Sequence, residues 1–176
     1  MKKIILSLIL LLIVGCNKNY LPLKTVNKVD IAKYSGLWYE VARLPNSFQE
    51  DCYGTTAEYE IIDNETIRVI NSCFEDSLNG EQDQAIGKAF IADKITNSKL
   101  KVQFFWPFKG DYWIIALDEI NYSYAMVGTP SREYLWILGR SKNFDKSILD
   151  KLVGYASENK FDTSKLIYES SIKLVN

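Results

Sequence analysis

The sequence predicts an all-β protein, an eight-stranded antiparallel up-and-down β-barrel with one C-terminal α-helix packed outside. From Gly36 to Arg140, short runs rich in aromatic and β-branched residues are separated by turn signals, as in an antiparallel barrel or sandwich. These runs number eight, at which a closed barrel is just wide enough to hold one small ligand. A stretch with apolar residues at helical spacing follows, at Ile148, Leu149, Leu152, Tyr155 and Ala156.

Residues 1–15 have the pattern of a signal peptide. Two lysines precede an eleven-residue apolar run, Ile4 to Val14, which is too short to span a bilayer as a helix. The run ends in Leu12-Ile13-Val14-Gly15-Cys16, which resembles a bacterial lipobox, where cleavage falls before the cysteine and its thiol receives a diacylglycerol. Acyl chains such as palmitate on Cys16 would anchor the protein, because two chains suffice for stable attachment. The alternative is an ordinary signal peptide with an incidental cysteine.

The residue after the cysteine bears on localisation. In enteric-type sorting, Asn17 in place of an aspartate implies transfer to the outer membrane of a Gram-negative envelope. Residues 16–29 are polar and proline-marked, and we expect a lipidated tether with no fold of its own. Residues 30–176 then form one folded domain, expected to be a monomer or a weak homodimer. With 21 Lys+Arg against 22 Asp+Glu and no basic patch, nucleic acid is not an expected partner.

Two cysteines remain if Cys16 carries lipid. Cys52 and Cys73 are an even pair in an exported protein, for which a disulfide is the natural expectation. If Asp63-Asn64 form a two-residue turn between strands, the two cysteines lie two residues away from direct register, which a bulge or a slanted pair can bridge. The alternative is two unpaired thiols.

Side-chain alternation assigns the inward face of the early strands. On the second and third strands, the residues expected to face inward are Thr55, Ala57, Tyr59, Ile61, Ile67, Val69 and Asn71. The fourth strand, residues 85–91, has the small residues Gly87 and Ala89 on one face. If these face inward, they leave room in the interior instead of filling it.

The fifth strand has the clearest alternation. Its expected inward residues are Leu100, Val102, Phe104 and Trp106. Pro107 ends the run because proline lacks the N–H donor that a strand ladder needs. Residues 112–118, 123–129 and 135–140 complete the eight strands. Asn143 or Asp145 can cap the helix that follows, and residues 164–170 alternate as a last strand that can join the barrel edge.

Two distant stretches are expected to meet at one end of the barrel. Gly36 and Trp38 open the first strand, and Arg140 ends the eighth. A guanidinium on the face of Trp38 would close the barrel there, with its charge against the ring and its N–H groups on backbone carbonyls.

This pairing of motifs resembles the lipocalins. Residues 30–43 carry the first family motif and residues 134–140 the third, and the resemblance covers nearly the whole mature domain. Phe105-Trp106-Pro107-Phe108, followed by residues 115–118, is similar to the bacterial lipocalins in particular, which are outer-membrane lipoproteins resembling apolipoprotein D. The second motif departs from the family pattern, since the hairpin at residues 118–125 has a longer turn.

The resemblance implies a membrane-anchored protein that binds a small hydrophobic ligand, a fatty acid or a lysophospholipid, for envelope lipid storage, transport or repair. The residues expected to line the ligand are Tyr59, Val102, Phe104, Trp106, Tyr112, Tyr134 and Trp136. Burying an acyl chain against them gains about 25 cal/mol per Å². Arg43 and Lys88 are candidates to meet an acidic head group, although both are expected to be solvated. Alternation leaves open whether the interior is filled or hollow.

An enzyme is the competing class, and the composition argues against it. The chain has no histidine, which removes the usual general base and the usual ligand of zinc or haem. It has no glycine-rich phosphate loop, so no cofactor is expected. A thiol-dependent isomerase would need a free Cys73 inside the barrel. A third class is a structural or protein-binding envelope lipoprotein whose barrel is packed solid.

Overall fold

The computed structural model describes residues 20–175, so the predicted signal peptide and the lipidation of Cys16 fall outside the described residues. The elements, in chain order, are α1 (Ile31–Tyr34), β1 (Gly36–Arg43), β2 (Cys52–Ile61), β3 (Thr66–Glu75), β4 (Gln82–Ile91), β5 (Lys99–Gln103), β6 (Gly110–Leu117), β7 (Tyr124–Gly128), β8 (Leu135–Gly139), β9 (Asn143–Asp145), α2 (Lys146–Glu158), the 3₁₀ turn η1 (Thr163–Lys165), β10 (Ile167–Tyr168) and β11 (Lys173–Val175).

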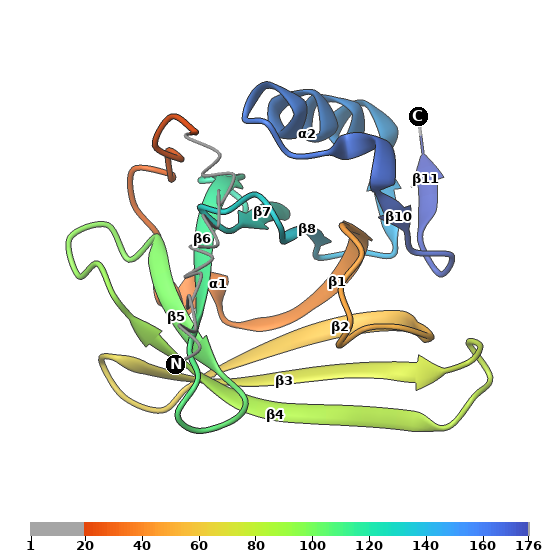
Figure 1. Ribbon diagram of the computed structural model, residues 1–176, viewed down its shortest axis with the longest axis horizontal. Coiled ribbons are helices and arrows are strands. Elements are labelled where there is room, and N and C mark those ends of the chain that lie inside the picture. Colours follow the sequence, from red (N-terminus) through yellow and green to blue (C-terminus); the bar gives the residue numbers. More distant parts are fainter. Residues whose placement is uncertain (1–19, 176) are drawn as a thin grey trace, which may run out of the picture.

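The predicted eight-stranded antiparallel barrel is confirmed. Strands β1 to β8 pair in sequence order, and β1 also pairs with β8, which closes the sheet on itself (Figure 1). The predicted last strand is present as β10, which adds to the edge of β1 as a ninth strand. β9 and β11 form a separate two-stranded parallel sheet.

The disulfide between Cys52 and Cys73 is present, with a Cα–Cα distance of 5.4 Å. The turn that joins β2 to β3 is longer than predicted, because the strands end at Ile61 and resume at Thr66. The register of this hairpin also shifts between Tyr53 and Thr56. That bulge contains Gly54 at φ +62°, in the left-handed region that favours glycine, and it brings the two cysteines together.

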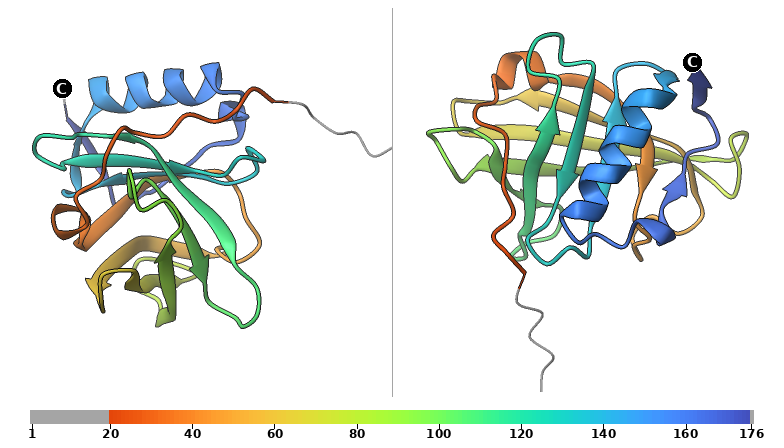
Figure 2. Two further views of the ribbon diagram at one scale, coloured as in Figure 1. Left: turned by 90° about the vertical axis from the view of Figure 1, so that its left-hand side faces the viewer. Right: turned by 90° about the horizontal axis from the view of Figure 1, so that it is seen from above.

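Helix α2 lies across the outside of the barrel, as predicted (Figure 2). Asp145 caps it, since its carboxylate accepts from the backbone N–H groups of Ser147 and Ile148. Its buried residues, Leu149, Leu152 and Ala156, belong to a cluster with outward-facing residues of β1, β6, β7 and β8. This second cluster lies on the opposite side of the barrel wall from the lumen. None of the described helices is long and apolar enough to cross a membrane.

Residues 20–29, which fall within the expected tether, pack against the barrel. Leu23 and Val29 are buried, each in one of the two apolar clusters. The backbone N–H of Val26 donates to the carbonyl of Ile114 on β6, and that of Val29 donates to Thr96. Residues 20–29 therefore pack along the barrel wall, because their apolar side chains and backbone groups find partners there.

The two ends of the barrel are built differently. The closed end is defined by α1 and the loops at residues 62–65, 92–98 and 118–123. The open end is defined by the loops at residues 44–51, 76–81, 104–109 and 129–134. These two names are used below.

Candidate ligand-binding site

The lumen near the closed end is filled by three tyrosines. Tyr34 comes from α1, Tyr59 from β2 and Tyr112 from β6, and all three are buried. The Tyr112 hydroxyl lies 2.8 Å from that of Tyr34 and 2.7 Å from that of Tyr59. Burial raises the pKa of Tyr59 to about 12 and raises the pKa of the other two phenols well above the ordinary value. All three therefore stay neutral at physiological pH.

Below the tyrosines, Trp38 and Arg140 seal the barrel. The guanidinium carbon of Arg140 lies 3.8 Å from the centre of a Trp38 ring. Its N–H groups donate to the backbone carbonyls of Lys33, Tyr34, Ser35 and Leu37. Gly36 has φ +87°, which a residue with a side chain rarely adopts, and the chain turns there from α1 into β1. The structure thus brings together the three residues of the expected closing motif.

Toward the open end, the inward face is reached by solvent. Three residues lie opposite one another on neighbouring strands, Ala57 on β2, Asn71 on β3 and Ala85 on β4. Each is an even number of positions from a buried residue of its own strand, and therefore faces the lumen as that residue does. These buried residues are Tyr59, Val69 and Ala89. Yet Ala57 and Asn71 are half-buried and Ala85 is exposed. The inward face is therefore partly open to solvent at this end. These inward-facing positions, with the side chains around them in the upper lumen, are called the cup below.

Most of the predicted lining residues surround this cup. Val102, Phe104 and Trp136 are partly buried against the same cluster as Tyr59 and Tyr112. The Phe104 ring lies over Gly87, where a Cβ atom would come within 2.7 Å of it, so the space left by that glycine is filled. Tyr134 stacks on Trp136, with their ring centres 6.0 Å apart.

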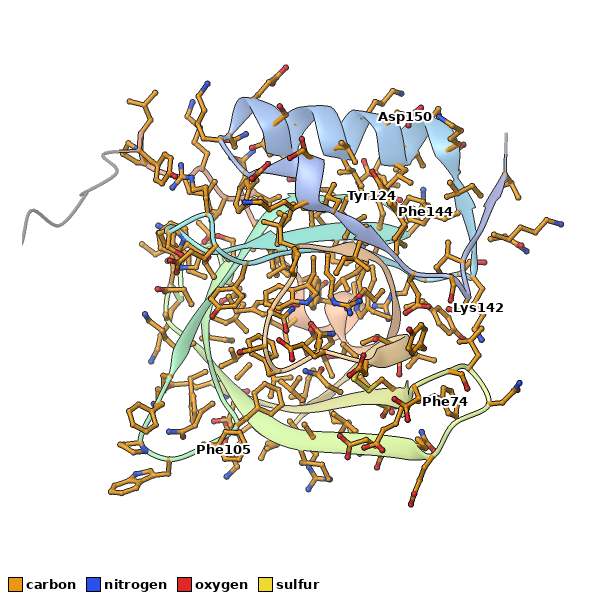
Figure 3. The ribbon with its side chains drawn as sticks, turned by 45° about the vertical axis from the view of Figure 1, so that its right-hand side comes forward. Phe74, Phe105, Tyr124, Lys142, Phe144 and Asp150 are labelled. Carbon is orange, nitrogen blue, oxygen red and sulfur yellow. A yellow bond between two sulfur atoms is a disulfide. The ribbon has the colours of Figure 1, made fainter. Side chains whose placement is uncertain are left out.

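The prediction for Trp106 is wrong. Strand β5 ends at Gln103, three residues before this tryptophan, so the alternation of the strand no longer governs where the side chain points. Trp106 lies in the loop between β5 and β6 and is 87% exposed. Its neighbours Phe105 and Phe108 are also exposed, and Figure 3 labels Phe105 at the lower left of the view, far from α2. Ile61, expected to face inward, is likewise exposed, because β2 ends there at the rim of the closed end.

A buried polar network joins the loop at residues 44–51 to the cup. Glu40 accepts from Arg43 at 2.8 Å and from the side-chain amide of Gln49 at 2.9 Å. Gln49 also accepts from the indole N–H of Trp136 at 2.9 Å. Burial raises the pKa of Glu40, and the charge of Arg43 opposes that rise. In the same loop, Phe48 stacks on Tyr134 with ring centres 5.6 Å apart.

Of the two head-group candidates, Lys88 is solvated as expected and Arg43 is not. Arg43 is buried in its ion pair with Glu40, so it is not a solvated cation. Lys88 is exposed and has the opposite parity to Gly87 and Ala89, which places it on the outer face of β4. Neither side chain offers a free positive charge to the lumen.

The thiol needed by an isomerase is not free. Cys73 is bonded to Cys52, so the sulfur is held in a disulfide and cannot act as a nucleophile. Among residues 20–175, no group of three or more acidic or cysteine side chains is placed to hold a metal ion.

Comparison with known proteins identifies the family. The model of the lipocalin-like domain matches residues 29–171. This chain is a lipocalin.

Curated relatives of this lipocalin include bacterial and animal proteins. It is 41% identical over 168 residues to the outer membrane lipoprotein Blc of Vibrio cholerae, covering 96% of this chain and 98% of the relative. Its identity to outer membrane lipoprotein Blc of Escherichia coli is 36%, with 89% of each chain covered. Apolipoprotein D of Macaca fascicularis is 31% identical over 78% of this chain and 74% of that protein.

Solved structures agree on the fold. Insecticyanin of the tobacco hornworm Manduca sexta superposes on this lipocalin with a TM-score of 0.69 at 25% sequence identity, covering 86% of each chain. Apocrustacyanin A1 of lobster superposes with a TM-score of 0.63 at 19% identity, covering 81% of this chain and 78% of that one.

The lipocalin also has a lateral pocket of about 710 Å³ beside the cup. It is lined by the loop at residues 44–51, the start of β2 and residues 167–170. It forms where β1 stops pairing with β2 after Tyr39 and pairs with β10 from Ala42 onward. None of the seven predicted lining residues borders this pocket.

Several residues of the site were missed by the sequence analysis. Glu40 has the same parity as Trp38, so alternation along β1 could have placed it inside the barrel. Tyr34 sits on a four-residue helix and Phe48 in a loop, where no periodic pattern marks an inward side chain. Their positions follow from contacts between elements far apart in the chain.

Proposed function

We propose that this lipocalin is anchored in the outer membrane and binds one single-chain lipid, a fatty acid or a lysophospholipid, in the barrel, without acting as an enzyme. The observation that carries the proposal is the open cup, whose inward wall includes Val102, Phe104 and Trp136 and whose far end is sealed. An acyl chain placed there removes apolar surface from water, which is favourable by about 25 cal/mol per Å². The names of the bacterial relatives support the localisation.

The start of the described chain supports an orientation with the open end toward the membrane. The carbonyl of Leu21 accepts from Arg132 at 2.7 Å, and Arg132 lies in the loop between β7 and β8 at the open end. Four residues of extended chain from Cys16 to Tyr20 span at most about 14 Å. Lipid on Cys16 would therefore hold the open end close to the bilayer.

The exposed aromatic residues fit the same orientation. Phe105, Trp106 and Phe108 lie in the loop between β5 and β6, which is also at the open end. Aromatic side chains are favoured at the interface between membrane and water. Ligand exchange between the cup and the bilayer would then occur over a short distance, as lipid storage, transport or repair requires.

Native mass spectrometry tests the lipid-binding proposal. The mature chain with Cys16 replaced by serine is titrated with a fatty acid and with a lysophospholipid, while tryptophan emission is followed. We expect a one-to-one adduct and quenched emission, and the same spectra report whether the protein is a monomer or a weak homodimer. No adduct at tens of micromolar, with unchanged emission, would instead favour a solid barrel that acts through its surface.

The anchor is tested separately. Intact-mass analysis of the full-length protein expressed in a Gram-negative host should show cleavage before Cys16 and added acyl mass. C16S should move the protein from the membrane fraction to the soluble fraction. A wild-type protein that is soluble and carries no added mass would overturn the anchoring proposal.

A further inference from the structure

The three tyrosines at the bottom of the cup have one more hydrogen-bond donor than they can use among themselves. Each phenol carries one O–H donor and can accept at its oxygen. The cluster makes two contacts, Tyr34 to Tyr112 and Tyr59 to Tyr112, and no other hydrogen bond of these hydroxyls is found among residues 20–175. Two contacts use two hydrogens, so one hydroxyl hydrogen has no partner.

The barrel wall cannot supply the missing acceptor. The cluster that surrounds the phenols is apolar and includes Val69, Leu100, Ile114 and Val127. The tyrosines are 3%, 5% and 9% exposed at Tyr34, Tyr59 and Tyr112, so bulk water does not surround them either. A buried donor without an acceptor is unfavourable, and native proteins rarely leave one.

The open side of the cluster leads into the cup. Tyr112 is the most exposed of the three, and Val102 on the neighbouring strand β5 is only partly buried, as is Phe104 just after that strand. The guanidinium of Arg140 lies on the other side, and its charge opposes the rise in the pKa of Tyr34 and Tyr59 that burial causes. A positive potential at the bottom of the cup favours an atom with partial negative charge there.

We propose that Tyr34, Tyr59 and Tyr112 bind an oxygen atom at the deep end of the ligand, so that the barrel prefers single-chain lipids that carry a hydrogen-bond acceptor there. Two kinds of lipid bring such an oxygen. A fatty acid can enter with its carboxyl group first, or a chain can enter tail first with a hydroxyl or keto group near its far end. A plain methyl end leaves the donor unsatisfied. This inference rests on the proposed function.

The test compares lysophosphatidylcholines of equal chain length. Their large zwitterionic head group stays at the mouth, so the chain enters tail first. One has an unmodified chain, and the other has a keto group next to its terminal carbon. A fatty acid of the same length is the third probe. Dissociation constants are measured by native mass spectrometry and tryptophan quenching on the mature C16S protein.

We expect the keto chain to bind about tenfold more tightly than the plain chain, which corresponds to about 1.4 kcal/mol. In the triple variant Tyr34→Phe/Tyr59→Phe/Tyr112→Phe, which has no phenol donor left, that advantage should fall below about twofold, while the plain chain binds as well as before. Tyr59→Phe leaves two hydroxyls that share one contact, and so still one unused donor. It should keep the advantage, and it remains informative if the triple variant fails to fold. Tyr124→Phe, on β7 in the outer apolar cluster, is the matched control and should keep the advantage.

Infrared spectroscopy with ¹³C-labelled carbonyls separates the two kinds of ligand. A carbonyl that accepts from a phenol shifts to lower frequency, and the triple variant should abolish that shift. A shift for the carboxyl label of the fatty acid means that it enters carboxyl first. A shift only for the keto label means that the chain enters tail first and that its keto oxygen accepts from a phenol. Plain and keto chains that bind equally, with no carbonyl shift, would overturn the inference and leave lipid binding intact, whereas no binding by any probe would overturn the proposed function.

Discussion

The closed end and the open end of the barrel use the same types of residue for opposite purposes. At the closed end, Trp38 is fully buried, and Arg140 donates to four backbone carbonyls beside it. At the open end, Trp106 is almost fully exposed, and the arginine, Arg43, is held by a carboxylate inside the wall. The comparison indicates that stability is concentrated at one end, which leaves the other end free for ligand and membrane.

The largest effect is expected when one tryptophan is truncated at each end, which tests whether stability is concentrated at the closed end. Trp38→Ala removes a fully buried indole and should lower the free energy of unfolding by about 4 kcal/mol. Trp106→Ala removes an exposed side chain and should change it by less than about 0.5 kcal/mol. Urea denaturation of the two variants measures both values. Similar losses in the two variants would contradict the division of roles.

The buried ion pair near the open end gives the next largest effect. Glu40→Leu leaves the Arg43 guanidinium buried without its carboxylate, so we expect a loss of about 3 kcal/mol. The double variant Glu40→Leu/Arg43→Met removes both charges and should be more stable than the single variant. Chemical denaturation of the wild type, both single variants and the double variant completes the cycle. A double variant no more stable than Glu40→Leu would show that the pair does not act as a unit.

Alkaline pH should weaken the closed end through its tyrosines. The pKa of Tyr59 is raised to about 12, so the folded state holds this proton more tightly than the unfolded state does. Its contribution to stability is complete below pH 10 and is lost as the pH rises from 10 toward 12, by about 1.4 kcal/mol per pH unit.

Tyr59→Phe removes this group, so its free energy of unfolding should fall less steeply than that of the wild type between pH 10 and 12. Denaturation curves at several pH values give the slopes, and Tyr53→Phe controls for loss of a tyrosine hydroxyl elsewhere on β2. Identical slopes for Tyr59→Phe and the wild type would argue against a tightly held phenol proton.

The smallest effect is expected at the mouth of the cup. Phe48→Ala removes an aromatic ring stacked on Tyr134 and should reduce stability by about 1 kcal/mol. Because this ring covers the aromatic wall, bound fatty acid should also dissociate faster, as measured by stopped-flow tryptophan fluorescence. Phe108→Ala, an exposed ring in a neighbouring loop, is the control and should change neither quantity. Equal dissociation rates in the two variants would show that Phe48 does not cover the mouth of the cup.

Much of the fold could be predicted from the sequence because its signals are local. Alternation in the strands reports which side chains share a face, and this placed Tyr59, Tyr112 and Trp136 toward the lumen. The apolar spacing of α2 and the cap at Asp145 are also contained in adjacent residues. The even pair of cysteines was enough to expect the disulfide between Cys52 and Cys73.

The sequence by itself therefore determined which residues of each strand face inward, which residue caps α2, and which distant motifs have to meet. Only the tertiary structure decided where a strand ends and its alternation no longer predicts which way a side chain points. Trp106 lies beyond the last ladder hydrogen bond of β5, and residues 20–29 are ordered by partners on β6 and in the loop before β5. It also decided which inward positions are filled, since Phe104 occupies the space at Gly87 while Ala85 is exposed. These outcomes depend on packing between elements distant in the chain, which no local pattern encodes.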